Sequence, residues 1–206
     1  MTDKAYAQLE EMIVTLQLPP GAVLSEILLA QRLSTGRTPI REALQRLSRD
    51  GLVNILPRRG VLVSEIDLSA QLRLLEVRRE LERLLARGAA KRATPDEREE
   101  FTEIARGMRE AAEREDDLAF MRLDQQFNAL LSAAGRNEFA TRSMGLMHGL
   151  SRRFWYQHYK QAADLPLAAR LHAEAAEAVA SGDVRKAGEA SDALVNYIES
   201  FARSTL

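Results

Sequence analysis

The stretch STGRTPIREALQRLSRDGLVNILPRRGVLV, residues 34–63, decides the fold of the N-terminal part of this 206-residue chain. It contains no lysine and two acids, Glu42 and Asp50, whereas the whole chain carries a net charge of −1. The cations of this segment are all arginine. When a nearly neutral chain concentrates arginine in one short segment, that segment is expected to be a local binding surface. The arginines of the stretch are Arg37, Arg41, Arg46, Arg49, Arg58 and Arg59.

Local signals divide this stretch into a turn, a helix and a hairpin. After the turn STG, Thr38 is expected to cap a helix whose first residue is Pro39, because the N–H that proline lacks has no partner at that position. Gly51 ends the helix at the position that favours a left-handed backbone. The segments LVNIL and VLVS predict two short strands joined by the turn PRRG. The expected buried face of the helix consists of Ile40, Ala43, Leu44 and Leu47.

Two more helices are expected before this stretch. Apolar residues recur at Tyr6, Leu9, Ile13 and Leu16 with helical spacing, and LPPG ends that helix. A second short helix is expected over residues 26–33. The order helix, helix, turn, helix, hairpin predicts a winged helix-turn-helix, whose second helix enters the major groove of DNA.

The arginines at the start of the third helix are the main candidates for DNA contact. Arg37 and Arg41 are four residues apart and share a helix face, and arginine pairs well with guanine and with phosphate. The alternative is a solvated basic face, in which Arg46 and Arg49 pair with Glu42 and Asp50, and we accept this alternative for Arg46. The full set of predicted DNA-binding residues is Arg37, Thr38, Arg41, Arg49, Arg58, Arg59 and Gly60.

After Ile66 the strand signal ends and amphipathic helices follow. They are expected over about 67–92, 94–114, 116–134, 137–163, 166–181 and 183–203, and TPDE at 94–97 is a capping box. The predicted fold class is therefore mainly α: an N-terminal winged helix-turn-helix domain with a small β-hairpin wing, followed by an all-α helical bundle. We place the DNA-binding domain at residues 1–66 and an effector-binding and dimerisation domain at residues 67–206.

Composition excludes several classes of protein. At 46% hydrophobic residues the chain can build a core, and without cysteine it has no disulfide framework or thiol chemistry. No apolar run approaches the length of a membrane span, so we expect a cytoplasmic protein without a membrane partner. The chain also lacks a glycine-rich phosphate loop and a nucleophile motif, which argues against an enzyme.

The first domain resembles the winged-helix domain of GntR-type bacterial transcription regulators over about residues 4–66. The motifs are RTPIREAL, then DGLV, then RRGVLV. The resemblance implies DNA contact by Arg37, Thr38 and Arg41, and by Gly60 at the wing. The chain departs from the pattern at two positions: Ile27 replaces an arginine that many relatives carry, and Gly36 replaces a serine.

The second domain resembles the FCD ligand-binding domain of the FadR-type branch over roughly residues 67–203. The matching segments are EVRRELE, DQQFN, GRNEF and LHAEAAEAVASGDVRKA. In metal-binding relatives one aspartate and three histidines hold a divalent ion. Asp124 and His172 match two of these ligands, whereas Asn128 and Leu194 replace the others. A tight metal site is not expected, because asparagine is a poor ligand for transition metals and leucine is none.

The resemblance also implies a cavity for an effector. Arg78 matches a family arginine that points toward the ligand, so we expect a small organic acid there and no cofactor. The alternative is a weakly bound divalent metal ion held by Asp124 and His172 with Asn128 and water. Arg78 has its own alternative, an ion pair with Glu82 on the surface. The predicted effector-binding residues are Arg78, Asp124, Asn128, His148, Arg152, Tyr156 and His172.

These expectations combine into a ligand-responsive transcriptional regulator. We expect a repressor that binds a palindromic double-stranded DNA operator as a homodimer. One alternative is a DNA-binding protein without an effector. Another is a helical domain with residual enzymatic activity, in which Asp124 and His172 perform acid–base work.

Overall fold

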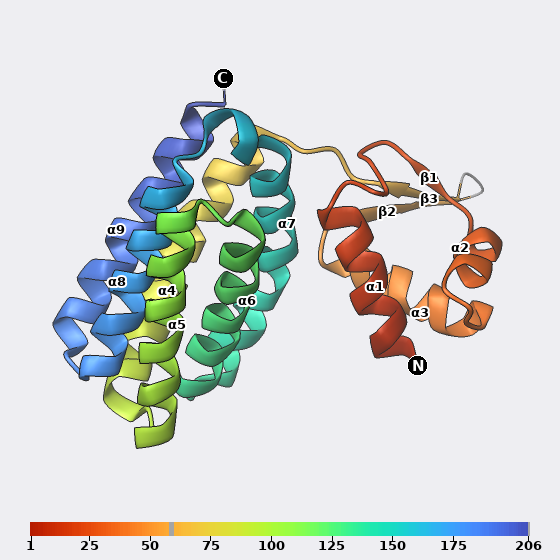
Figure 1. The fold of residues 1–206 in the computed structure, drawn as a ribbon. Helices are drawn as coiled ribbons and strands as arrows, with labels where there is room; N and C mark the ends of the chain where they lie inside the picture. The colour runs from red at the N-terminus through yellow and green to blue at the C-terminus, as the bar shows by residue number, and fades with distance from the viewer. Residues whose placement is uncertain (58–59, 206) are drawn as a thin grey trace. The chain divides into compact units, whose positions relative to one another are not determined.

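The computed structural model describes residues 1–57 and 60–205. In its first part, three helices and a small sheet follow one another, as Figure 1 shows. The elements are α1 (Thr2–Val14), β1 (Val23–Leu24), α2 (Glu26–Arg32), α3 (Arg37–Arg49), β2 (Val53–Leu56) and β3 (Gly60–Val63). The predicted winged helix-turn-helix is confirmed.

The helix after the STG turn begins earlier than expected. Gly36 is its N-cap, with extended backbone angles of φ −75° and ψ 161°, and no side chain caps the helix. The expectation that Thr38 caps it was therefore wrong, and Pro39 lies within the first turn, where its missing N–H still has no helical partner. Gly51 has φ +75°, which confirms the left-handed position after the helix.

The hairpin belongs to a three-stranded sheet. β2 and β3 pair antiparallel, with Val53 opposite Val63 and Leu56 opposite Gly60, so the two predicted strands of the hairpin are confirmed. The two-residue strand β1 pairs with the other edge of β3 and was not expected, because two residues give no periodicity to detect. The core beneath the sheet is built from α1, α2 and α3, and its fully buried residues include Leu9, Ile13, Ile40, Leu44 and Leu47.

The second part is helical, and its helices match the expected segments within one or two residues. They are α4 (Leu68–Arg92), α5 (Pro95–Arg114), α6 (Asp117–Ala134), α7 (Glu138–Ala162), α8 (Leu165–Ser181) and α9 (Val184–Arg203). The capping box is confirmed: Thr94 Oγ1 accepts from Glu97 N, and Glu97 Oε2 accepts from Thr94 N at 2.8 Å.

Small side chains allow the helices of this part to approach closely. α8 contacts α5, α6 and α9, and Figure 1 shows these helices side by side. Its buried face is mostly alanine, and that composition leaves room for Phe101 and Met108 of α5, both fully buried. One polar residue, His172, also lies on the buried face of α8.

Contacts divide the chain into two compact units. One unit contains Met1–Gln71 together with Gly145–His158 of α7, and the other begins with Leu72–Met144 and continues from Tyr159. Among the described residues, no helix is both long enough and apolar enough to cross a membrane.

Candidate functional site

The N-terminus of α3 presents its arginines to solvent. The side chains of Arg37 and Arg41 are 59% and 57% exposed, and Thr38 between them is exposed too. The opposite face of the helix is held in the core by Ile40 and Leu44. The start of α3 is therefore anchored on one face and leaves its cationic face open, as contact with a polyanion requires.

Glu26 of α2 positions both arginines. Its carboxylate accepts from Arg41 Nε at 3.1 Å and from Arg41 Nη2 at 2.9 Å, and it lies 3.7 Å from Arg37 Nη2. The bonds from Arg41 hold the pKa of the Glu26 carboxyl below its usual value. This acid joins the two helices of the helix-turn-helix and holds the guanidinium groups in one orientation.

The other arginines of α3 lie away from this acid. Arg46 pairs with Asp3 at 3.3 Å and its guanidinium stacks 3.9 Å from the Tyr6 ring centre. The expected pairing of Arg46 with Glu42 or Asp50 was wrong, because Asp50 accepts from the Tyr6 hydroxyl at 2.8 Å. The predicted DNA-binding residue Arg49 is exposed at the end of α3.

Part of the predicted wing lies outside the described residues. Arg58 and Arg59 are not described, so their role stays a prediction. Gly60 begins β3 with φ +94°, a backbone region that side chains rarely adopt. An added Cβ there would lie 3.9 Å from Val23 Cγ1 of β1, an ordinary van der Waals distance, so the backbone angle and not a lack of space favours glycine.

Three of the predicted effector residues meet inside the helical part. His172 Nε2 lies 3.0 Å from Asp124 Oδ1, and Asn128 Nδ2 donates to the same oxygen at 2.8 Å. The His172 ring is buried and packs edge-on against Phe120 and Phe127. Asp124 and Asn128 come from α6 and His172 from α8, so the cluster joins two helices.

The side chains of this cluster are not arranged as ligands of a divalent metal ion. His172 Nδ1 lies 2.8 Å from Ala168 O, so both ring nitrogens face oxygen atoms and neither directs a lone pair to open space. Asn128 presents its N–H groups to Asp124, where a metal-binding relative would present a histidine. Among residues 1–57 and 60–205, no group of three or more acids or histidines is arranged to hold an ion.

Arg78 has an acidic partner on its own helix. Its Nε donates to Glu82 Oε1 at 2.6 Å, and its Nη2 forms an ion pair with the same oxygen. Both side chains are buried, so the pair is not the surface pair considered as the alternative. The Glu82 carboxylate therefore balances the positive charge of Arg78 in the protein without ligand.

The remaining predicted effector residues lie on α7. Arg152 forms ion pairs with Glu10 at 3.7 Å and with Glu11 at 3.1 Å, both on α1. His148 and Tyr156 are half-buried. These three residues belong to the contact unit of the DNA-binding part, whereas Asp124 and His172 belong to the helical unit.

Sequence reasoning missed one acid that organises these sites, Glu26, and expected another, Glu82, on the surface. Glu26 is 15 residues from Arg41, a separation at which no local rule predicts contact. Glu82 stands four residues after Arg78, so the pairing was visible in the sequence but its burial was not.

Both parts of the chain match models of known protein families. Residues 1–63 match the model for bacterial regulatory proteins of the gntR family. Residues 73–197 match the FCD domain. The two matches cover the winged helix-turn-helix and most of the helical part.

The curated relatives that the chain matches are transcription regulators. The transcriptional repressor RspR of Escherichia coli K12 is 31% identical over 132 residues, which is 64% of this chain and 58% of that protein. An uncharacterized regulator from the TAR-I ttuE-ttuC' region of Agrobacterium vitis is 33% identical over 63% of this chain and 77% of its own length. A Streptomyces ambofaciens regulator is 47% identical over 62 residues, which cover 30% of this chain and 26% of that protein.

Solved structures share the fold. Escherichia coli McbR/YncC superposes with a TM-score of 0.85 at 19% identity, covering 99% of this chain and 97% of that one. A putative GntR regulator from Rhodococcus superposes with a TM-score of 0.72 at 20% identity, over 100% and 98% of the two chains. The chain belongs to the GntR family of bacterial transcriptional regulators and carries an FCD domain.

Proposed function

We propose that this protein is a cytoplasmic repressor that binds a palindromic DNA operator as a homodimer and responds to a small organic acid in its FCD domain. The observation that carries the DNA part is the pair of exposed arginines, Arg37 and Arg41, at the N-terminus of α3. Repression is supported by one relative, the transcriptional repressor RspR of Escherichia coli.

In this proposal the arginines at the start of α3 exchange their contacts with Glu26 for contacts with DNA. In the free protein Arg41 is bonded to Glu26 through two nitrogen atoms, the same fork that binds guanine or phosphate. A base or a phosphate of DNA replaces Glu26 as the acceptor of some of these hydrogen bonds. Before DNA binds, Glu26 keeps the guanidinium groups oriented. Exposed Thr38 adds a hydroxyl that can donate to phosphate.

A dimer follows from the size of the recognition unit. One winged helix covers one half-site, and a two-fold dimer doubles the contact on a palindrome. Residues 67–206 expressed alone are expected to dimerise, because the helical part supplies the dimer contacts in this proposal. Sedimentation at micromolar concentration tests this, and a monomeric fragment contradicts it.

In this proposal the effector competes with the carboxylates of Glu82 and Asp124 for their partners Arg78 and His172. The carboxylate of an organic acid binds Arg78 or His172 in exchange for Glu82 or Asp124, and Asn128 meets a hydroxyl of the ligand. A ligand that rearranges buried ion pairs binds one conformation better than the other, and that difference in affinity drives the switch.

The DNA part is tested by selection. Purified protein is incubated with random double-stranded fragments, and the bound fragments are sequenced. Wild-type protein is expected to enrich an inverted repeat that Arg41→Ala does not. Arg106→Ala is the matched control, since it removes an exposed arginine of α5 that pairs with Glu103 of its own helix. Failure of wild-type protein to enrich any sequence contradicts the proposal.

The effector part is tested by thermal stability. A ligand that binds only the folded protein raises its melting temperature. Hydroxylated mono- and dicarboxylates are compared with the primary amides of the same acids, and His172→Ala is the control variant. Stabilisation by the acids and not by the amides supports the proposal. Stabilisation by the amides alone, or by no acid, contradicts the organic acid and leaves the DNA part unaffected.

Metal content is measured on the same protein. Elemental analysis of protein purified without added metal or chelator is expected to show no stoichiometric zinc or nickel, because the His172 cluster lacks the ligands. One equivalent per chain that is lost in His172→Ala contradicts the metal-free effector site.

A further inference from the structure

A groove of about 570 Å³ lies in the DNA-binding part of the protein, between α1, α2 and the turn that leads into α3. The turn, residues 34–36, and Arg37 of α3 line it together with one side of each of the other two helices. Residues four apart on a helix lie on one side of it, and each helix contributes such a pair to the groove. The pairs are Lys4 and Gln8 of α1 and Ile27 and Gln31 of α2.

Small side chains create this groove. Ala5 of α1 and Ala30 of α2 line it, and both belong to the buried core of the DNA-binding part. Because an alanine side chain ends at Cβ, the facing helices leave a space that longer side chains would fill. Ile27, which is 53% exposed, adds apolar surface beside them. The lining therefore offers apolar atoms next to polar groups, which suits a ligand that has both an apolar and a polar side.

The charge of the groove is positive. Among the described residues that line it, the charged side chains are Lys4 and Arg37. The acid next to Lys4 in the chain, Asp3, pairs with Arg46 at 3.3 Å. Glu26 approaches Arg37 only to 3.7 Å, so this arginine is held less closely than one that forms hydrogen bonds. The polar side of a ligand in this groove is therefore expected to be an anion.

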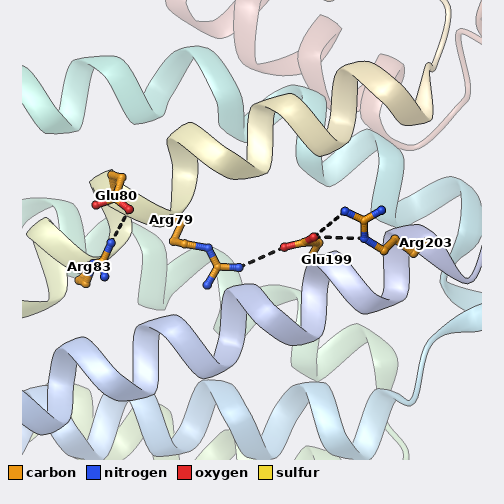
Figure 2. Close-up of polar contacts among 5 residues, drawn as sticks. All are labelled: Arg79, Glu80, Arg83, Glu199 and Arg203. Atoms are coloured by element: carbon orange, nitrogen blue, oxygen red, sulfur yellow. Dashed lines mark hydrogen bonds and ion pairs between the residues drawn. The ribbon is translucent and has the colours of Figure 1, made fainter.

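Arginines of the helical part are balanced differently. Figure 2 shows Arg79 and Arg203 directed at Glu199, at 3.2 Å and 2.8 Å, and Arg83 directed at Glu80. Each of these guanidinium groups has a carboxylate partner within its own network. Their positive charge is largely cancelled at short range, so an anion gains less there than beside Lys4.

The groove continues the surface that is expected to meet DNA. Arg37 lines the groove and also belongs to the exposed cationic face of α3. Gly36, the N-cap of α3, lines it too, and no side chain caps that helix. In Figure 1 the N-terminus of α1 and the hairpin β2–β3 lie at opposite ends of this part. When α3 enters the major groove, the two DNA backbones pass on either side of it, so the wing and the groove serve different stretches of backbone.

We propose that this groove binds the sugar–phosphate backbone of the operator at the edge of each half-site. A phosphate oxygen accepts from Lys4 and Arg37, and the apolar side of a deoxyribose packs on Ile27 and the alanines. Ile27 stands where many relatives carry an arginine, and Lys4 on the facing helix supplies the cation instead. This contact rests on the proposed DNA binding. It holds α3 in register without reading bases.

The salt dependence of binding tests the phosphate contact of Lys4. Full-length Lys4→Ala is compared with wild type by fluorescence anisotropy on operator and scrambled duplexes over a range of salt. It is expected to bind both duplexes about three- to tenfold more weakly, and the slope of log K against log salt should fall by about one per bound chain. Lys91→Ala, which removes an exposed lysine of α4, is the control and should change neither quantity. A loss confined to the operator, or no loss, overturns the proposal.

Two neighbouring residues of α2 test the groove itself. Ile27 lines it, whereas Leu28 is 64% exposed and lies outside the lining. Ile27→Glu is expected to weaken binding to both duplexes about tenfold, and Leu28→Glu about twofold or less, because only the first places an acid against the phosphate. Ile27→Arg should strengthen binding several-fold and raise the salt slope by about one per chain. Circular dichroism checks the fold. Equal effects of the two glutamates would show that their charge acts at a distance and not in the groove.

Uncharged phosphates identify the contact directly. Methylphosphonate replaces one phosphate of the operator at a time, and each duplex is bound to wild type and to Lys4→Ala. At one position at the edge of each half-site, wild type is expected to lose affinity and Lys4→Ala to lose none, since the two changes remove the same contact. Additive losses at every position contradict the proposal.

Failure of the groove contact is distinguishable from failure of DNA binding. If wild-type protein selects no DNA, the proposed function fails. If it selects an operator that Arg41→Ala does not bind, while Lys4→Ala and Ile27→Glu bind that operator as wild type does, DNA binding stands and the groove inference is wrong.

Discussion

Glu26 binds Arg41 through two hydrogen bonds, from Nε at 3.1 Å and from Nη2 at 2.9 Å, across the turn of the helix-turn-helix. The arginine that is expected to read DNA is therefore held in place by an acid of the preceding helix. This acid also lies near Arg37. The arrangement orders the cationic face and at the same time reduces its charge.

Removing either partner should have opposite effects on DNA binding. Arg41→Ala is expected to cost about 1–3 kcal/mol in operator binding, because a base or phosphate contact is lost. Glu26→Gln should strengthen binding to random DNA several-fold and weaken discrimination, because the face loses a negative charge and the arginines lose the carboxylate that orients them. Fluorescence anisotropy with operator and scrambled duplexes at matched salt measures both. Unchanged operator affinity in Arg41→Ala contradicts the docking of α3.

The buried pair of Arg78 and Glu82 should be sensitive to the loss of one partner. Glu82→Ala leaves a guanidinium buried without its acid and is expected to cost about 3–5 kcal/mol in unfolding free energy. Glu189→Ala is the matched control, because it breaks an exposed pair with Arg185 of the same spacing and should cost less than about 0.5 kcal/mol. Urea unfolding followed by circular dichroism measures both, and equal effects would show that burial of the pair does not matter.

The capping box should make part of the stability depend on pH. The N–H of Thr94, and then Arg136, hold the pKa of Glu97 below its usual value. A carboxyl with a lowered pKa in the folded state stabilises above its unfolded pKa, and this contribution is lost as pH falls through the folded pKa. Glu97→Gln keeps the capping hydrogen bond and loses the charge. It should cost about 0.3–1 kcal/mol at pH 7.

The same variant should match wild type in strong acid, where both side chains are uncharged. Thr94→Ala, which removes the cap itself, should cost about 1 kcal/mol at either pH. Thermal unfolding at neutral and acid pH measures these differences. A constant difference between Glu97→Gln and wild type across the titration would contradict the assignment of the effect to the charge of Glu97.

Restoring the missing ligands should create a metal site. Asn128→His with Leu194→His supplies the two histidines that the resemblance to metal-binding FCD domains calls for. The double variant is expected to bind about one zinc per chain by elemental analysis, since four ligands of this kind suit zinc. His172→Ala in that background should abolish the binding. If the double variant holds no zinc, residues 128 and 194 do not converge with His172.

The sequence by itself determined the helices, the two strands of the hairpin and their order, whereas the short strand β1 was not expected. The Thr94–Glu97 capping box, Gly51 after α3 and the apolar spacing of each helix act within a turn or two of the chain, so their signals are local and could be read directly. The arginine cluster of residues 34–63 also indicated the surface that we expect to meet DNA. The start of α3 was misjudged by two residues, because Gly36 caps the helix without a side chain that the sequence would reveal.

Only the tertiary structure decided which side chains meet. Glu26 reaches Arg41 because α2 and α3 pack at a particular angle, and His172 meets Asp124 because α6 and α8 bring their faces together. The burial of Glu82 and the exposure of Leu84 likewise depend on the neighbours that each side of α4 receives. Periodicity shows that a helix has an apolar face. It does not show what covers that face, because the covering residues come from distant parts of the chain.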